Sequence, residues 1–456
     1  MIEINSLKNV HLIGIGGIGV SALAEILINN DIKVTGSDIR SSEITNHLET
    51  LGVEIFYNHS EDNIHSDIDL LVYSSAVGEN NAEMKKAKDL QIPMMSRSEM
   101  QGTIMKDFKS SIAIAGAHGK TTATSMTSVI FNQTNLDPTS LIGAIVPEIG
   151  GNAKIGKKDI IITEACEYRE NFLDFHYTTA VILNIDEDHL DYFEDLNHIV
   201  DAFTKFANQL PKNGQLIINN DDYNAKKILS HLSIDNVVTF GISNDSNYTA
   251  KNITYNDLGT PKFDLLFNDK TLGKIELSIP GRHNIYNSLA AISIAHNYGI
   301  EFGIIQNVLR SFKGAQRRFE FKGTYAGAKI IDDYAHHPAE IKATLEAAKK
   351  IQDKKIIVAF QPHTYTRTKE LLNEFSLAFE NADEIIITDI YAARETDDLG
   401  VHSKDLTELI VKNGKKATYF GSFDEAKEYL IQKLDENTIF FTMGAGDIYL
   451  LGEMLI

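Results

Sequence analysis

The sequence predicts an α/β protein with three domains in series, on three observations. First, its 456 residues leave room for about three domains of roughly 150 residues each. Second, short apolar runs alternate with amphipathic stretches, as in parallel sheets with helical crossovers. Third, two glycine-rich loops, at residues 14–19 and 116–122, each follow an apolar run and precede a helix-like stretch. The expected domains are 1–107, 108–314 and 315–456.

The first domain carries a dinucleotide-type fingerprint. Gly14, Gly16 and Gly19 satisfy G-x-G-x-x-G between a strand-like run and a helix-like stretch, which favours a Rossmann-like sheet. Asp38 stands where such folds place their ribose acceptor. Strands are expected at 10–15, 33–38, 54–58 and 69–77, and helices at 20–30, 42–52 and 81–90. The loop predicts a diphosphate ligand, either a dinucleotide or another nucleotide.

The second loop, GAHGKTT at residues 116–122, differs from a Walker A motif because Ile114 stands where the first glycine is required. Its chemistry is still that of a phosphate loop. Backbone N–H groups at a helix N-terminus attract phosphate, Lys120 can reach the transferring group, and Thr121 can ligate Mg²⁺. The alternative is a glycine-rich turn with a surface lysine. The strand–loop–helix setting favours a P-loop ATPase-like central domain.

Metal ligands are expected where the neighbouring strands end, because open parallel sheets bind ligands there. Uniformly apolar strands are predicted at 159–165, 179–185 and 215–220. Glu164 ends the first, and residues 186–189 follow the second. Carboxylates suit Mg²⁺, whereas His189 would be a softer ligand. Residues 236–280, rich in turn formers, predict a small antiparallel addition, and a helix is expected at 284–299.

The third domain is expected to be Rossmann-like, with strands that run into polar loops. Its strand-like runs begin KIIDDYAHHP, KKIIVAFQPHT, EIIITDIYAAR and TIFFTMGAGD, and Ala-, Glu- and Lys-rich helices fill the intervals.

Composition narrows the function. The formal net charge of −20 argues against nonspecific nucleic-acid binding. Cys166, the single cysteine, excludes an intramolecular disulfide and fits a reducing compartment. The N-terminus lacks signal-peptide regions, and no apolar run approaches bilayer length. We therefore expect a soluble cytoplasmic protein without membrane or nucleic-acid partners, either a monomer or a weak homodimer.

Ordered motifs along essentially the whole chain resemble the Mur ligases, ATP-dependent amide-bond-forming enzymes of peptidoglycan (cell-wall) synthesis. The first are GAHGKTT, the glutamate after the next strand, and NIDEDH at 184–189. The others are PGRHNIYNSLAA (280–291), RRFE (317–320), DDYAHHPAEI (332–341), FQPHTYTRT (360–368) and GAGDI (444–448). Within the family, the N-terminal loop, DDYAHHP and FQPHTYTRT resemble the members that add L-alanine to UDP-N-acetylmuramate.

This resemblance implies that the first domain binds the UDP part of UDP-N-acetylmuramate rather than NAD. The implied residues are Gly14, Gly16, Gly17, Ile18, Gly19 and Asp38. The weaker candidates are Ser37, His59, Ser74, Ser75 and Arg97. It also implies that the muramate carboxylate takes the γ-phosphoryl group of ATP and that L-alanine then attacks the acyl phosphate.

The resemblance assigns the remaining roles residue by residue. The implied ATP-binding residues are Gly116, His118, Gly119, Lys120, Thr121, Thr122, Asn284, Asn287, Arg318 and Asp333. Thr121, Glu164 and His189 would hold Mg²⁺, with Mn²⁺ as a substitute. Tyr334, His336 and Arg367 would bind the amino acid. The implied catalytic set is Lys120, Glu164, His189, His336 and Arg367.

The chain departs from the family pattern in three places. It reads EACEYRE at 164–170, where the alanine-adding members have Asp-Glu-Ser-Asp near the metal glutamate, so the roles of Glu167 and Arg169 stay open. Thr364 stands where arginine is frequent. No residue is a candidate for the carbamylated lysine that several sister ligases use as a metal ligand.

Three alternatives remain. One is another muramyl-peptide ligase, adding a later residue or reattaching recovered peptide; Tyr334 and the FQPHTYTRT loop argue against it. The second is an NAD-dependent oxidoreductase, which would leave residues 116–122 and Glu164 without a role. The third is a nucleotide-regulated binding module, against which Lys120, Glu164 and His189 count.

Overall fold

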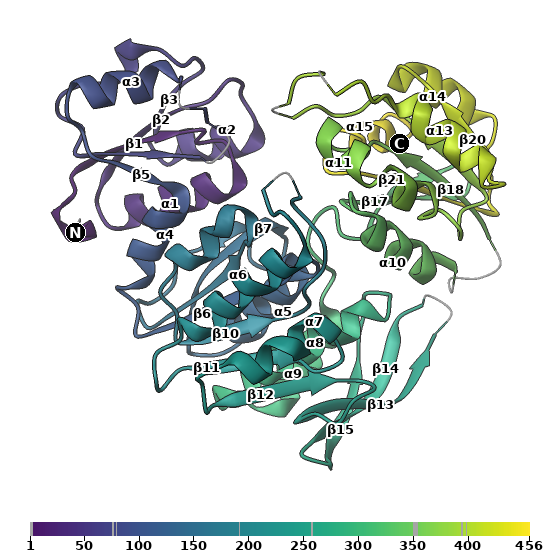
Figure 1. Ribbon diagram of the computed structural model, residues 1–456, viewed down its shortest axis with the longest axis horizontal. Coiled ribbons are helices and arrows are strands. Elements are labelled where there is room, and N and C mark those ends of the chain that lie inside the picture. Colours follow the sequence, from purple (N-terminus) through teal and green to yellow (C-terminus); the bar gives the residue numbers. More distant parts are fainter. Residues whose placement is uncertain are drawn as a thin grey trace.

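The structure, a computed structural model, describes residues 3–74, 77–78, 80–190, 192–256, 259–349, 354–393, 395–397 and 399–456. Its strands form three sheets that follow one another along the chain (Figure 1). We call the parts built on them the N-terminal, central and C-terminal units. The α/β class with three sheets is confirmed. Within the described residues, no helix combines the length and apolar character needed to cross a membrane.

The N-terminal unit is a doubly wound parallel sheet with strand order β3-β2-β1-β4-β5. Its strands are β1 (Asn9–Ile13), β2 (Lys33–Ser37), β3 (Glu54–Phe56), β4 (Leu70–Tyr73) and β5 (Met94–Ser96). Its helices are η1 (Ile4–Ser6), α1 (Ile18–Asn29), α2 (Glu43–Thr50), η2 (Glu61–Asn63), α3 (Ala82–Asp89) and α4 (Arg97–Met105). The order switches direction beside β1, which places the first glycine loop at the usual ligand-binding crevice. The predicted Rossmann-like arrangement is confirmed.

The sequence analysis predicted neither β5 nor α4. β5 has three residues and no alternating pattern. Helix α4 begins with a capping box, in which Ser96 accepts from the backbone N–H of Glu99 and the Glu99 side chain accepts from Ser96 N–H. The helix therefore starts immediately after the strand ends, and Ser96 with Glu99 three residues later is the sequence signal of this start that the prediction missed.

The central unit contains a mixed ten-stranded sheet with order β15-β14-β13-β12-β11-β10-β6-β9-β7-β8. Its strands are β6 (Ser110–Ala115), β7 (Thr139–Val146), β8 (Gly151–Lys154), β9 (Ile160–Ala165), β10 (Thr179–Ile182), β11 (Gln215–Asn219), β12 (Val237–Gly241), β13 (Tyr248–Tyr255), β14 (Pro261–Phe267) and β15 (Lys270–Glu276). Its helices are α5 (Lys120–Asn132), η3 (Tyr168–Asp174), α6 (Leu196–Asn208), α7 (Tyr223–Ile228), η4 (Leu229–His231), α8 (His283–Asn297) and α9 (Phe302–Ser311).

Strands β13, β14 and β15 form the expected antiparallel addition, but β12 is not part of it. β12 pairs in parallel with both β11 and β13, so the prediction for this first strand was wrong. The reason is that helices α7 and η4 connect β11 to β12, and such a crossover returns the chain in the same direction. The addition therefore extends the central sheet (Figure 1).

The C-terminal unit has strand order β16-β17-β21-β18-β19-β20, parallel except for the edge strand β16. Its strands are β16 (Glu320–Tyr325), β17 (Ala328–Asp333), β18 (Lys355–Phe360), β19 (Glu384–Ile387), β20 (Ala417–Tyr419) and β21 (Thr438–Met443). Its helices are α10 (Pro338–Lys349), α11 (Tyr365–Glu370), α12 (Leu372–Ser376), α13 (Ser403–Lys412), α14 (Phe423–Ile431) and α15 (Tyr449–Glu453). The loops after β17, β18 and β21 leave the same edge of the sheet, which faces the central unit.

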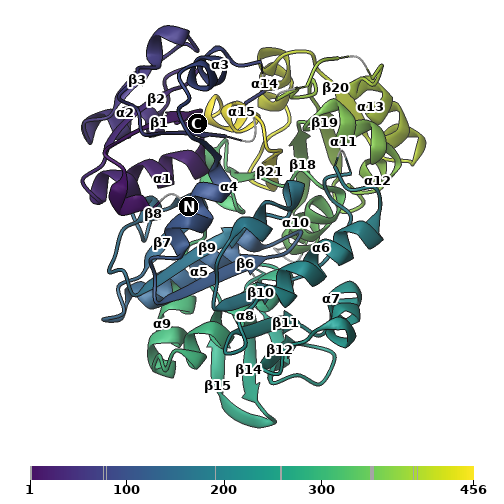
Figure 2. The ribbon, with the colours of Figure 1, turned by 60° about the vertical axis from the view of Figure 1, so that its left-hand side comes forward.

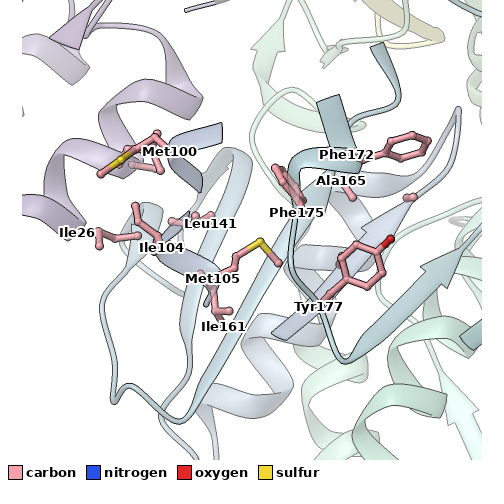
Figure 3. Close-up of a cluster of buried hydrophobic side chains, with 14 of the residues drawn as sticks. Ile26, Met100, Ile104, Met105, Leu141, Ile161, Ala165, Phe172, Phe175 and Tyr177 are labelled. Atoms are coloured by element: carbon pink, nitrogen blue, oxygen red, sulfur yellow. The ribbon is translucent and has the colours of Figure 1, made fainter. Parts of the chain in front are cut away.

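One hydrophobic cluster joins the N-terminal and central units. Met100, Ile104 and Met105 of α4 lie on the same side as Leu141 and Ile161 of the central sheet (Figure 3). Helix α1 lies against the hairpin of β7 and β8 (Figure 2). A Cβ at position 102 of α4 would lie 2.0 Å from the carbonyl oxygen of residue 174, so a glycine is required for this approach. The packing fixes α4 on the central sheet.

Candidate functional site

The second glycine loop connects the end of β6 to the start of α5. Gly116 and Gly119 have φ values of 148° and 85°, in the region that favours glycine. A Cβ on Gly119 would also lie 2.4 Å from Oδ1 of Asn287. The glycine conformations that such a loop needs are therefore present, and the loop leads directly into the N-terminus of α5, with Gly119 at the N-cap.

Lys120, the first residue of α5, points back into this loop. Its ammonium donates to the carbonyls of Gly116 and Ala117 and lies 2.9 and 3.1 Å from the two carboxylate oxygens of Glu167. Burial opposes the charged form, but the nearby Glu167 carboxylate raises the pKa of Lys120 above its ordinary value. The lysine is thus a firmly charged ammonium that faces a carboxylate.

The predicted metal ligands Thr121 and Glu164 lie together. The hydroxyl of Thr121 donates to one oxygen of Glu164 at 3.1 Å, and the other oxygen accepts from Gly143 N–H at 2.5 Å. Burial raises the pKa of Glu164, although these contacts and Lys120 oppose the shift. A hydroxyl beside a carboxylate at a phosphate loop is a hard oxygen donor set, which fits Mg²⁺.

His189 lies instead with Glu167 and Asp188. One potential ligand atom from each of these three residues lies within 4.8 Å of the other two. His189 has φ 56°, a left-handed backbone, and its ring packs on Tyr168 at a centroid distance of 4.7 Å. Burial lowers the pKa of His189, which favours the neutral imidazole that a metal requires. Its predicted role as a ligand thus has geometric support, with different neighbours from those expected.

A cavity of about 390 Å³ lies between the central and C-terminal units. The predicted ATP residues that line it are His118, Gly119, Thr122, Asn284, Asn287, Arg318 and Asp333. Asn287 donates to the side chain of Asn284 at 3.0 Å, and Asn284 donates to Pro280 O at 2.7 Å. The two amides are therefore held in fixed orientations on the first turns of α8. Tyr286 and Asp221, which the sequence analysis did not propose, also line the cavity. The Tyr286 hydroxyl donates to the Asp221 carboxylate at 3.0 Å.

The adjacent arginines 317 and 318 have different environments. Arg317 donates to Asp332 at 2.9 Å and to the carbonyls of Gly444 and Gly446 at 2.7 and 3.0 Å. Arg318 instead lines the large cavity. Asp333 accepts from Phe319 and Ala335 N–H groups, and burial raises its pKa to about 6.

His118 connects the two sides of the cavity. Its ring nitrogens lie 3.3 Å from Asp186 of the central unit and 3.4 Å from Glu340 of α10. Burial opposes its charged form, but the two carboxylates raise the pKa of His118 to about 10. Sequence reasoning missed Glu340, although it lies inside the DDYAHHPAEI motif. A charged imidazole thus links the phosphate loop to the C-terminal unit.

A second cavity, of about 130 Å³, is lined by all three predicted amino-acid-binding residues: Tyr334, His336 and Arg367. Arg367 donates to Asp188 across the units at 3.0 Å. The His336 ring contacts Tyr334 O at 3.0 Å through Nδ1, which leaves Nε2 to face other groups. Thr364, also at this cavity, has φ 64° and ψ 148°, an unusual backbone for a β-branched residue.

The Asp38 carboxylate lies against the first glycine loop. Asp38, expected at the nucleoside, accepts from the N–H of Gly16 at 2.8 Å and of Ile39 at 2.7 Å. Gly14 is adjacent to Ser74, since a Cβ on Gly14 would lie 3.2 Å from the Ser74 Cβ. Residues 17–19 start α1, with Gly17 at the N-cap. Ser75 lies outside the described residues.

Ser37 and His59 both contact a buried glutamate that the sequence analysis missed. Glu83 is 0% exposed and lies 2.7 Å from the Ser37 hydroxyl, 2.8 Å from His59 and 2.8 Å from Asn63. Burial opposes ionisation, but these contacts and His11 lower the pKa of Glu83. Glu83 points inward from the short helix α3, a position that its charge alone did not indicate.

Arg97, the first residue of α4, lies beside the N-terminus of α1. Its Cδ would be 3.1 Å from a Cβ on Gly19, and it donates to Gln101 at 2.7 Å. In the described part of the chain no carboxylate lies within ion-pair distance of Arg97. The guanidinium and the helix N-terminus together favour an anion.

Three family models match the chain in order. They are described as the Mur ligase family catalytic domain at residues 9–109, the Mur ligase middle domain at 114–295 and the Mur ligase glutamate ligase domain at 317–446.

Two relatives that match almost the whole chain have the same name. The UDP-N-acetylmuramate–L-alanine ligase of Alkaliphilus metalliredigens is 50% identical over 99% of this chain and 98% of its own length. The protein of the same name from Caldanaerobacter subterraneus is 46% identical over 100% and 98%. The crystal structure of UDP-N-acetylmuramate-alanine ligase from Thermotoga maritima superposes with a TM-score of 0.83 at 30% identity, covering 98% of both chains. A murein peptide ligase from Psychrobacter arcticus, 23% identical with a TM-score of 0.75, shares the fold.

Proposed function

The chain belongs to the Mur ligase family, and we propose that it joins L-alanine to the carboxylate of UDP-N-acetylmuramate. ATP is cleaved to ADP and phosphate, and the product, UDP-N-acetylmuramoyl-L-alanine, is a peptidoglycan precursor. The observation that carries this proposal is the pair of cavities between the central and C-terminal units. The larger adjoins the phosphate loop, and the smaller has the size and charge for a small amino acid.

The larger cavity is the ATP site. Gly116–Gly119 and Lys120 hold the phosphates, because the helix N-terminus and the ammonium both attract anions. Asn284 and Asn287, held by hydrogen bonds on α8, read the adenine, and the buried carboxylate of Asp333 accepts from the ribose. Arg318 lies at the chain segment that leads into the C-terminal unit and neutralises phosphate charge.

The acceptor arrives on the N-terminal unit. The glycine loop at residues 14–19 and Arg97 hold the diphosphate, while His59 and Ser74 contact the rest of the UDP group. Ser37 is fully buried and acts on this site through its hydrogen bond with His59. Asp38 fixes the loop through Gly16 N–H. We also propose that the chain divides functionally at 1–107, 108–314 and 315–456. The acceptor site then lies on the first unit, and the ATP and amino-acid sites lie between the second and third units.

The reaction has two steps that balance. A carboxylate oxygen of the muramate attacks the γ-phosphorus of ATP, ADP leaves, and an acyl phosphate forms. The amine of L-alanine then attacks the acyl carbon, and phosphate leaves with the original carboxylate oxygen. Lys120 stabilises the transferring group, and catalysis is mainly positioning and charge neutralisation.

The metal requirement follows from the donor set. Thr121 and Glu164 would hold Mg²⁺ at the phosphates, and His189 would face a second cation near the carboxylate; Mn²⁺ is a substitute. A bound divalent cation screens the negative charge on ATP and on the attacking carboxylate.

The smaller cavity holds the amino acid. Arg367 pairs with its carboxylate, Tyr334 flanks its side chain, and His336 accepts a proton from its ammonium through Nε2. A volume of about 130 Å³ suits a small amino acid. Together with the shared name of the relatives that match almost the whole chain, it favours L-alanine addition over the alternative of a peptide-recycling ligase.

An isotope experiment tests the proposed chemistry. UDP-N-acetylmuramate labelled with ¹⁸O in its carboxylate is incubated with ATP, Mg²⁺ and L-alanine, and the released phosphate is examined by mass spectrometry. One labelled oxygen is expected in each phosphate formed. Unlabelled phosphate, formed by attack of water on ATP, would contradict an acyl-phosphate intermediate.

A further inference from the structure

One carboxylate connects the two cavities between the central and C-terminal units. Glu340, in the first turn of α10, lines the larger cavity, and its side chain is only 14% exposed. It contacts His336, which lines the smaller cavity. The backbone N–H of His336 donates to the Glu340 carboxylate at 3.0 Å, as in a capping contact at a helix N-terminus. This contact alone would give Glu340 a purely structural role.

The imidazole of His336 makes a second contact with the same carboxylate. Its Nδ1 lies 3.2 Å from Oε2 of Glu340 and 3.0 Å from the carbonyl oxygen of Tyr334. A carboxylate and a carbonyl are both hydrogen-bond acceptors, so Nδ1 between them must carry a proton. In the neutral imidazole, the lone pair then lies on Nε2.

The neighbours of this pair fix both the ring and the carboxylate. The rings of Tyr334 and His363 lie at 76° to the His336 ring, at centroid distances of 5.3 and 5.9 Å. The other oxygen of Glu340 lies 3.4 Å from Nδ1 of His118, in the phosphate loop. Burial opposes ionisation of Glu340, but the two histidines hold its pKa well below the ordinary value. Glu340 is therefore a charged acceptor in a fixed position.

We propose that Glu340 is a positioning residue for the amino-acid site: it keeps a proton on Nδ1 of His336, so that Nε2 can accept one from the ammonium of L-alanine. The ammonium nitrogen has no lone pair and can attack only after this transfer. The proton passes to Nε2, the amine nitrogen bonds to the acyl carbon, and phosphate leaves. The Glu340 carboxylate stabilises the imidazolium that forms. The inference rests on the proposed function and adds a residue that acts through His336.

Hydroxylamine separates proton acceptance from the other steps. Its nitrogen is neutral at pH 7 and attacks an acyl phosphate without a proton acceptor, which gives a hydroxamate and phosphate. Phosphate release is therefore measured with ATP, Mg²⁺ and UDP-N-acetylmuramate, with either L-alanine or hydroxylamine as the nucleophile. E340Q keeps the side-chain volume and removes the charge. Release with L-alanine should fall about 10- to 100-fold, a part of what a positioned base contributes, and release with hydroxylamine should stay within about twofold.

Two further variants show whether Glu340 acts through His336. The matched control is E346Q, which changes an exposed glutamate of the same helix and should leave both rates at the wild-type level. E340Q added to H336N should lower release with L-alanine by less than about twofold beyond H336N alone, because residues that act as a unit are not additive. Three results would overturn the proposal: unchanged release with L-alanine in E340Q, parallel loss with both nucleophiles, or effects of E340Q and H336N that multiply.

A measurement on the wild type covers the case in which E340Q does not fold. NMR of protein labelled with ¹⁵N-histidine reports which ring nitrogen carries the proton, and comparison with H336N assigns the His336 signals. The neutral His336 imidazole should be protonated at Nδ1, and protonation at Nε2 would overturn the proposal. This readout needs no turnover. A wild type that releases phosphate with hydroxylamine but not with L-alanine would count against the proposed function, and the NMR result would stand separately.

Discussion

Replacement of Arg317 by methionine tests the different roles of the two adjacent arginines. Arg317 is the ion-pair partner of Asp332, which is 1% exposed, and it also donates to the carbonyls of Gly444 and Gly446. The R317M variant keeps most of the side-chain volume but leaves the Asp332 carboxylate without its cation. The loss should therefore appear in the stability of the C-terminal unit.

The magnitude follows from these contacts. Breaking a buried ion pair by removing one partner costs about 3–5 kcal/mol. Because the Arg317 side chain is 22% exposed, we expect the lower end, about 3 kcal/mol. For a unit of this size, each 1 kcal/mol lowers the Tm by about 2–4 °C, so the expected decrease is about 6–12 °C.

Differential scanning calorimetry measures the effect, and R318M is the matched control. Arg318 lines the proposed ATP cavity, and in the described part of the chain no carboxylate lies within ion-pair distance of it. R318M should shift the Tm by less than about 2 °C while greatly reducing phosphate release. A Tm decrease in R317M no larger than that in R318M would refute the structural role of Arg317 and the functional role of Arg318.

Three further predictions concern charged groups. K120M should lower phosphate release at least about 10³-fold, measured in a coupled assay, while calorimetry finds UDP-N-acetylmuramate affinity within about twofold; parallel loss of both would mean that the two nucleotide sites are not separate. His118 has a pKa of about 10 in the fold, above its ordinary 6.5, so its stabilisation is complete below pH 6.5 and is lost as the pH rises towards 10. H118N should therefore cost about 2–3 kcal/mol in urea unfolding at pH 6.5 and much less at pH 10; a pH-independent cost would contradict this. The contacts that lower the pKa of Glu83 stabilise the fold above pH 4.5, and this contribution disappears as the pH falls below 4.5. E83Q should thus lower the free energy of unfolding by about 1–3 kcal/mol at pH 7 and weaken UDP-N-acetylmuramate binding. Unchanged affinity in the folded variant would show that Glu83 does not position the UDP-N-acetylmuramate site.

The glycine loops and the residues after strand ends were predictable from sequence because their geometry is local. Gly116 and Gly119 need left-handed backbone, and Thr121 and Glu164 meet because adjacent parallel strands end at one edge. The order of the motifs then identified the family.

The functional residues that the sequence analysis missed depend on contacts between residues far apart in the chain. Glu83 and Glu340 acquire their meaning from partners many residues away in the chain, and nothing in their local pattern separates them from solvent-exposed glutamates. Arg317 and Arg318 are adjacent in one motif, and only the fold shows that one faces Asp332 and the other the cavity. The edge strand β20 has only three residues, too few for a clear periodicity.

Phosphate release with ATP, Mg²⁺ and UDP-N-acetylmuramate, measured with each of the twenty amino acids in turn, is the most direct test of the proposed function. We expect release that depends on L-alanine, because the cavity at Tyr334, His336 and Arg367 suits a small amino acid. Release that depends on a larger amino acid, or none with any of the twenty, would contradict it.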